Sequence, residues 1–186
     1  MNFLNYYNHP KNFRYDSFKF ALSEAYKRKL KIFVETGVAR GKQKFLFFSR
    51  INWKDGMSTM IFVDYVKFVQ GHLYSCDIKK INVYHAKKFV KKNLDVVSFF
   101  IDDSLKFLNN FDKKIDFLYL DSLDGQFEGA SKHQLKEVEI ALAKLNKNAL
   151  ILLDDKGVKT KLSINYLLEN SYKIVNETKE QVLLSL

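Results

Sequence analysis

The segment Val34-Glu35-Thr36-Gly37-Val38-Ala39-Arg40-Gly41 decides how the rest of this sequence is interpreted. It overlaps a short β-rich run, residues 31–35, that stops at Gly37, and its two glycines allow a backbone to approach a ligand closely. A helix that begins beyond such a turn can bind a carboxylate at its N-terminus. The GxxxG spacing differs from the GxGxxG fingerprint of dinucleotide-binding proteins, which argues against a nicotinamide-dependent oxidoreductase.

Short strand-like runs alternate with longer helical ones along the chain, which predicts βαβ units and a parallel sheet. We expect an α/β fold with one doubly wound sheet in a single domain over residues 1–186. Its first part, residues 1–30, is an N-terminal helical extension. The predicted strands are 31–35, 72–76, 96–101, 115–120 and 149–153. The predicted helices are 15–29, 57–69, 79–92, 104–110, 131–146 and 160–170. The runs 172–175 and 181–184 should form an antiparallel pair.

Length and composition favour one folded unit without a membrane span. The chain has 186 residues, of which 47% are hydrophobic, enough to bury a core. It has no run of about 18 apolar residues, and its first residues lack the apolar stretch of a signal peptide. Cys76 is the only cysteine, so no intrachain disulfide can form. We therefore expect a reducing, cytoplasmic compartment and no membrane partner.

Acidic residues end the predicted strands. Glu35, Asp77, Asp103, Asp121 and Asp154 each lie at or just after the carboxyl end of one strand. In open α/β sheets, ligands bind outside those ends. Five acids on one edge repel one another, so this edge is predicted to bind a ligand or a cation.

Motif by motif, the sequence resembles class I S-adenosylmethionine (SAM)-dependent methyltransferases. The segment 34–41 looks like their E-x-G-x-x-x-G motif, and Gly56-Met57-Ser58-Thr59 looks like the G-x-S-T that opens their first helix. Here residues 42–55, which include several aromatic residues, lie between the two motifs, and a short helix is expected in this region. The insert is predicted to be either a lid over the site or a surface loop whose aromatic side chains pack on the core. The insert leaves open whether Gly41 or Gly56 lies against the methionine part of the cofactor. The resemblance implies the sheet order 3-2-1-4-5-7-6, with strand 7 antiparallel.

The resemblance also implies a set of SAM-binding residues. Asp77 would bind the ribose hydroxyls, and Asp103 or the next residue would meet the adenine amino group. Capping of the helix at 104–110 by Asp103 or Ser104 is a compatible alternative. The full predicted set is Glu35, Thr36, Gly37, Gly41, Ser58, Asp77, Asp103, Ser104 and Asp121.

The acids after strands four and five resemble those of the metal-dependent O-methyltransferases, including the macrocin and catechol types. By this resemblance Asp121, Asp154 and Asp155 would be metal ligands, and oxygen ligands suit Mg²⁺. The alternative is that these acids cap helices or line a cofactor pocket without a metal. A bound metal would lower the pKa of a substrate hydroxyl, and Asp124, His133 or Lys156 would accept its proton.

The expected activity is methyl transfer to a hydroxyl of a small molecule, such as a sugar or a phenol- or polyketide-like acceptor. A non-catalytic SAM-binding module and an RNA methyltransferase are the alternatives. The net charge of +10 supports nucleic-acid binding. However, the lysines are spread over most predicted helices, and Asp121-Ser122-Leu123-Asp124 lacks the prolines of amino-methylating DNA enzymes. We therefore favour a small-molecule partner over nucleic acid; the oligomeric state is not readable.

Overall fold

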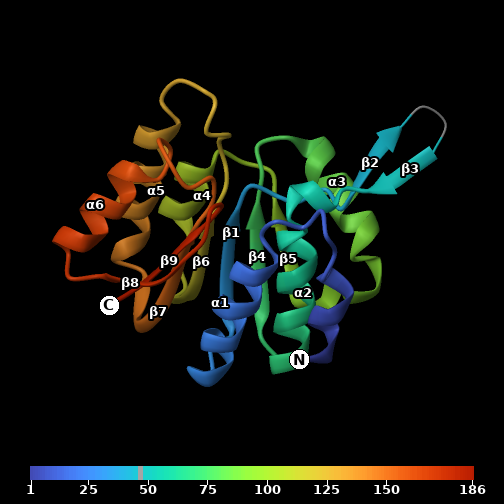
Figure 1. Cartoon of the computed structure of the whole chain (residues 1–186), viewed down its shortest axis with the longest axis horizontal. Coiled ribbons are helices and arrows are strands. Elements are labelled where there is room, and N and C mark those ends of the chain that lie inside the picture. The colour runs from blue at the N-terminus through green and yellow to red at the C-terminus, as the bar shows by residue number, and fades with distance from the viewer. Residues whose placement is uncertain (46–47) are drawn as a thin grey trace.

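Seven strands form one mixed sheet in the computed structural model, which describes residues 1–45 and 48–186 (Figure 1). The strand order is β5-β4-β1-β6-β7-β9-β8. All neighbours are parallel except β9, which is antiparallel to both β7 and β8. Without the separate hairpin β2–β3, this is the predicted order 3-2-1-4-5-7-6. The bounds are β1 Ile32–Thr36, β4 His72–Cys76, β5 Val97–Phe100, β6 Ile115–Leu120, β7 Leu145–Leu153, β8 Lys173–Glu177 and β9 Val182–Ser185.

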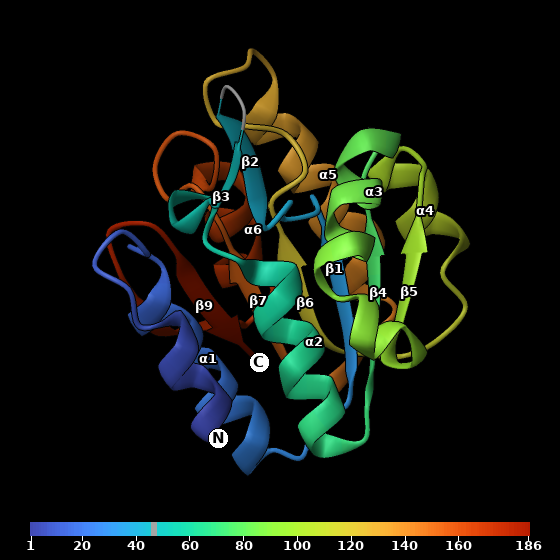
Figure 2. The same cartoon turned by 90° about the vertical axis from the view of Figure 1, so that its right-hand side faces the viewer.

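Helices cover both faces of the sheet (Figure 2). One face carries α1 (Tyr15–Lys27), α2 (Ser58–Val69) and α3 (Lys80–Phe89). The other carries α4 (Ser104–Asn110), α5 (Ala130–Leu142) and α6 (Lys161–Glu169). The described residues also form the 3₁₀ helices η1 (Asn2–Tyr7), η2 (Trp53–Asp55) and η3 (Lys91–Val96). Of the described helices, not one is both long and apolar enough to cross a membrane.

A hydrophobic core fills each side of the sheet because successive strand residues point to opposite faces. Phe33 and Phe117 belong to the core under α1 and α2, where their rings stack with centroids 4.4 Å apart. Val34 and Leu118, one residue later on each strand, belong to the core under α5 and α6. Because β1 pairs in parallel with β6, with Thr36 opposite Leu120, the two strands end at the same edge of the sheet.

The boundary between α5 and β7 differs from the prediction. The helix ends at Leu142 rather than near residue 146, and β7 begins at Leu145 rather than 149. Leu145 pairs with Ile115 of β6, and the Lys144 ammonium binds the carbonyls of Leu108, Asn109 and Phe111. These long-range contacts draw residues with helical spacing into the sheet. The predicted helix 79–92 likewise ends at Phe89.

The predicted insert forms a hairpin, β2 (Lys42–Phe45) with β3 (Phe48–Ile51), followed by η2. The expected short helix is thus a single 3₁₀ turn. Leu46 and Phe47 lie outside the described residues. Figure 1 shows the hairpin projecting at the end of the molecule where the parallel strands end. Ile51 and Trp53, at its base, pack against the core; a lid function stays a prediction.

Candidate functional site

The turn after β1 runs directly against the end of β6. Gly37 has φ +86°, and a Cβ at this position would lie 2.0 Å from the carbonyl oxygen of Asp121. The Gly37 N–H also donates to the carbonyl of Cys76, at the end of β4, over 2.9 Å. The positive φ and the lack of room for a Cβ both require glycine. The predicted glycine turn is therefore present, and it joins the ends of β1, β4 and β6.

Asp77, at the end of β4, organises a small pocket beside this turn. Its carboxylate accepts hydrogen bonds from the Val38 N–H at 3.1 Å, the Lys79 N–H at 2.7 Å and the Asn82 amide at 2.9 Å. The pocket has a volume of about 130 Å³. It is lined by Gly37, Val38, Ala39, Arg40, Asp55, Asp77, Ile78, Lys79, Asn82, Asp121, Ser122 and Asp124. Gly37, Asp77 and Asp121 of the predicted cofactor set therefore meet here.

Glu35 supports the glycine turn from behind the pocket. Its side chain is fully buried and accepts hydrogen bonds from the hydroxyls of Ser58, Thr59 and Ser75. The Thr59 oxygen in turn accepts the Ala39 N–H at 2.8 Å. Burial raises the pKa of Glu35 to about 7 although the three hydroxyl hydrogen bonds oppose it. The structure therefore places Glu35 and Ser58, like the buried Thr36, behind the pocket wall.

The other predicted cofactor residues lie away from this pocket. A Cβ at Gly41 would meet the side chains of Met60 and Phe89, and one at Gly56 would meet Arg14. Gly37 lines the pocket, and neither of these two glycines does. Asp103 caps α4 by accepting two backbone N–H groups, as the alternative interpretation predicted. The Ser104 hydroxyl lies 2.9 Å from His133 Nε2.

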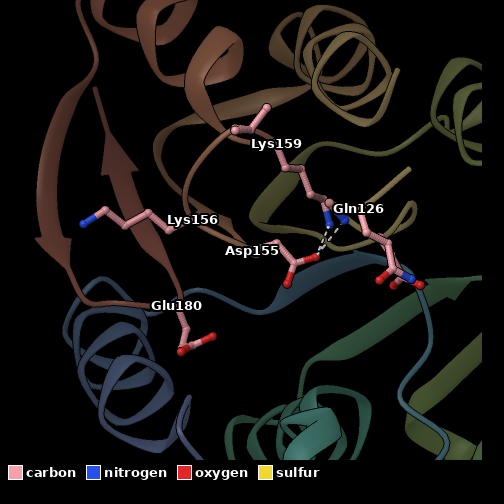
Figure 3. A pocket seen from close by; sticks show the side chains of 8 residues that line it. Gln126, Asp155, Lys156, Lys159 and Glu180 are labelled. Atoms are coloured by element: carbon pink, nitrogen blue, oxygen red, sulfur yellow. Dashed lines mark hydrogen bonds and ion pairs between the residues drawn. The ribbon is translucent and has the colours of Figure 1, made fainter. Parts of the chain in front are cut away.

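A second, larger pocket of about 610 Å³ opens next to the first (Figure 3). Asp124 lines both pockets. Lys156 also lines the second pocket, but its side chain points away from the Lys159–Asp155 pair (Figure 3), and its Nζ lies 2.6 Å from Glu177. His133 lines neither of these two pockets. Of the three predicted bases, Asp124 alone therefore lies between the two pockets.

The three predicted metal ligands converge. Carboxylate oxygens of Asp121, Asp154 and Asp155 lie within 4.8 Å of one another. Arg14 Nε donates to both oxygens of Asp154, at 2.7 and 2.9 Å, and its Nη2 lies 3.1 Å from Asp155. Lys159 Nζ lies 3.0 Å from Asp121 and 3.1 Å from Asp155. Two basic side chains thus occupy the space among the three acids.

These contacts shift the acids in opposite directions. Burial acts to raise the pKa of Asp154, but the charge and hydrogen bonds of Arg14 outweigh it and hold that pKa below its usual range. Burial, followed by repulsion from Asp154, raises the pKa of Asp121 well above its usual range. Burial acts to lower the pKa of Lys159, and the charges of Asp121 and Asp155 raise it overall.

A divalent ion does not fit this arrangement. Mg²⁺ needs near-octahedral oxygen ligands at about 2.0–2.1 Å, and both oxygens of Asp154 already bind Arg14. Gln181 also donates to Asp154 at 2.9 Å.

The sequence predicted where the acids meet but missed Arg14 and Lys159. The i, i+4 spacing of Asp155 and Lys159 was the one available signal for the lysine.

Comparison with solved structures shows the same fold. A SAH-bound methyltransferase from Podospora anserina superposes with a TM-score of 0.67 and 12% identity, covering 91% of this chain and 77% of that chain. An rRNA methylase from Streptococcus thermophilus superposes with a TM-score of 0.63 and 12% identity, covering 95% of this chain and 98% of that chain. A SAM-dependent O-methyltransferase from Thermotoga maritima superposes with a TM-score of 0.64 and 12% identity, covering 91% of this chain and 64% of that chain. No curated protein sequence matches significantly.

The sequence itself also matches a family. The model of the family described as "Methyltransferase domain" matches residues 34–156. This span includes the glycine turn, Asp77 and the acids that follow β6 and β7. Because it covers more than half of the chain, the protein belongs to the methyltransferase domain family.

Proposed function

We propose that this protein transfers the methyl group of SAM to a hydroxyl of a small molecule, a sugar or a phenol- or polyketide-like compound. The observation that carries the proposal is the meeting of two pockets at Asp124. The smaller pocket has the glycine turn and Asp77, which suit the cofactor. The larger pocket is lined mostly by polar side chains, which suit a hydroxylated acceptor.

Cofactor binding follows from the smaller pocket. The Asp77 carboxylate is held by three donors from the chain, so it is oriented to accept hydrogen bonds from ribose hydroxyls. Gly37 allows the cofactor to lie close to the backbone. SAH in the Podospora structure and the SAM dependence named for the Thermotoga enzyme support this assignment by analogy of fold.

The reaction requires alignment more than covalent participation by the protein. SAM supplies an electrophilic methyl group when bound. The acceptor oxygen forms a bond to the methyl carbon as the sulfur–carbon bond breaks, so the protein must hold the two in line. Asp124, between the pockets, accepts the hydroxyl proton, and the Lys159 ammonium supplies positive charge beside the acceptor. The resemblance to metal-dependent enzymes implies Mg²⁺, but no step here requires it.

Calorimetric titration with SAM and SAH tests the cofactor assignment. We expect binding by the wild type and at least about tenfold weaker binding by Asp77→Asn, because hydrogen bonds to a charged group contribute about 1.5–3 kcal/mol. Asp112→Asn is the matched control, since Asp112 is an exposed acid between α4 and β6 outside the pocket. Absence of any cofactor binding to the wild type would refute the proposal.

Transfer of a labelled methyl group to a panel of sugars and phenols then tests the acceptor class. We expect Asp124→Asn to bind SAH like the wild type and to lose turnover. Cofactor binding without turnover on any acceptor would instead favour the non-catalytic module.

RNA methylation is a second candidate because the net charge is +10 and one similar structure is described as an rRNA methylase. Salt-dependent RNA binding, with affinity falling steeply as salt rises, would support it.

We also propose a cytoplasmic location, which is expected from the single cysteine and is tested by fractionation of cells.

A further inference from the structure

We propose that Arg14 and Lys159 together take the place of a divalent cation among Asp121, Asp154 and Asp155, so that this site works without a metal. The inference concerns the same site as the proposed methyl transfer, and its ion-binding arm can be tested without turnover. It rests on the contacts of the two basic side chains, on their burial and on the space made for Arg14.

Arg14 and Gln181 together hold both oxygens of the Asp154 carboxylate. The aspartate side chain is fully buried, and that of Arg14 is 14% exposed. With Nε donating to both carboxylate oxygens and Gln181 donating to Oδ1, Asp154 already has three hydrogen bonds. A metal ion would have to break the ion pair between the guanidinium and this fully buried carboxylate, which is strongly unfavourable.

Lys159 joins the other two acids. Its ammonium lies 3.0 Å from Asp121 at the end of β6 and 3.1 Å from Asp155 after β7. One positive group that contacts carboxylates from two neighbouring strands has the bridging role of a metal ion. Its side chain is only 2% exposed, so it is a fixed part of the site. Figure 3 shows the ammonium directed at Asp155 beside the larger pocket.

The chain makes room for Arg14. Gly56 precedes α2 with φ +75°, and a Cβ there would lie 2.7 Å from Arg14 Cδ. Arg14 Nη1 also donates to the carbonyl of Lys54 at 3.2 Å. The guanidinium is thus held by the insert on one side and by the strand-end acids on the other.

Charge leads to the same conclusion. The two basic groups lie within hydrogen-bond distance of all three acids in a confined space. A doubly charged ion placed among them would meet two fixed positive charges within the same few ångströms. Removal of both basic groups should expose three carboxylates with oxygens close enough to bind one hard cation.

Titration with Mn²⁺, followed by the electron paramagnetic resonance signal of the free ion, tests this inference. We expect the wild type to bind no Mn²⁺ specifically at concentrations up to about 1 mM. The double variant Arg14→Met/Lys159→Met should bind one Mn²⁺ per chain with a dissociation constant at least about tenfold below that limit. The matched control is Lys27→Met/Arg28→Met, which removes the same charges from the end of α1, where both residues lie next to Glu24 and contact none of the three acids.

A second variant covers the case in which the double variant does not fold. In Lys159→Met, the former partners Asp121 and Asp155 remain 28% and 29% exposed, so water can solvate them and the variant should fold. It should bind Mn²⁺ more tightly than the control. The inference is overturned if the wild type binds one ion that Asp154→Asn abolishes. It is also overturned if the folded Arg14 and Lys159 variants bind no better than the control.

The same samples keep the two proposals apart. SAH binding by the wild type tests the proposed function, and its absence would refute that function while leaving the Mn²⁺ comparison valid. If SAH binds and methyl transfer is found, activity in excess EDTA should equal activity in Mg²⁺.

Discussion

Arg14 and Asp154 form an ion pair across 140 positions of sequence, in which Nε lies 2.7 and 2.9 Å from the two carboxylate oxygens. The pair connects the residue before α1 to the end of β7. Because the Asp154 side chain is fully buried, water cannot replace the guanidinium. The N-terminal extension is therefore part of the candidate site as well as a cover for the sheet.

Loss of this ion pair should be costly. We expect Arg14→Met to lower the free energy of unfolding by about 3 to 5 kcal/mol, because it leaves Asp154 buried and charged without its cation. Urea denaturation followed by circular dichroism measures this. Adding Asp154→Asn should recover part of the loss, since no charge then remains buried. Arg28→Met, which removes a more exposed arginine bonded to Ser185, is the control. An equal loss in the two single variants would contradict the argument.

Local patterns were sufficient to predict the sheet and the meeting of the acids. A buried parallel strand is a short apolar run, so Asp121 and Asp154 mark where β6 and β7 end, and parallel ends share an edge. Leu145 has helical spacing, yet pairing with Ile115 places it in β7. Arg14 could not be assigned to the site either, because its partner lies 140 residues away and only the tertiary fold brings the two together.

Gly37 and Gly129 offer a comparison of backbone strain with and without a steric clash. Both have positive φ, +86° and +82°, but a Cβ at Gly129 meets nothing within 4 Å. We expect Gly129→Ala to cost about 1–2 kcal/mol for the left-handed conformation alone. Gly37→Ala should cost about 1–3 kcal/mol more. The Asp121 carbonyl cannot move away from the new Cβ, because the backbone N–H of Asp121 is hydrogen-bonded to the Thr36 carbonyl.

Chemical denaturation of the two alanine variants measures the difference. SAH titration adds a second readout, because displacement of the turn moves the Val38 N–H away from Asp77. Gly37→Ala should lose cofactor binding, whereas Gly129→Ala should retain it. Equal stability losses together with unchanged SAH binding would show that the turn tolerates a side chain.

The buried carboxyl of Glu35 should make stability depend on pH. Its pKa rises from 4.5 to about 7 on folding, chiefly through burial, so between these values the folded state binds a proton that the unfolded state releases. The bound proton therefore contributes about 3 kcal/mol to the free energy of unfolding. This stabilisation is fully present below pH 4.5 and is lost as pH rises through 7. Glu35→Gln removes the titration and can still accept from Thr59 and Ser75 while donating to Ser58.

Unfolding free energies of wild type and Glu35→Gln, measured at intervals from pH 4.5 to 8.5, test this directly. The wild type should lose stability relative to the variant as pH rises, because only the wild type must then ionise a carboxyl enclosed by β1, β4 and α2. Glu139→Gln, which removes an exposed carboxylate from α5, should run parallel to the wild type. If the difference between wild type and Glu35→Gln is constant over this range, Glu35 does not change its proton occupancy on folding, and the three hydroxyl hydrogen bonds then balance the cost of its burial.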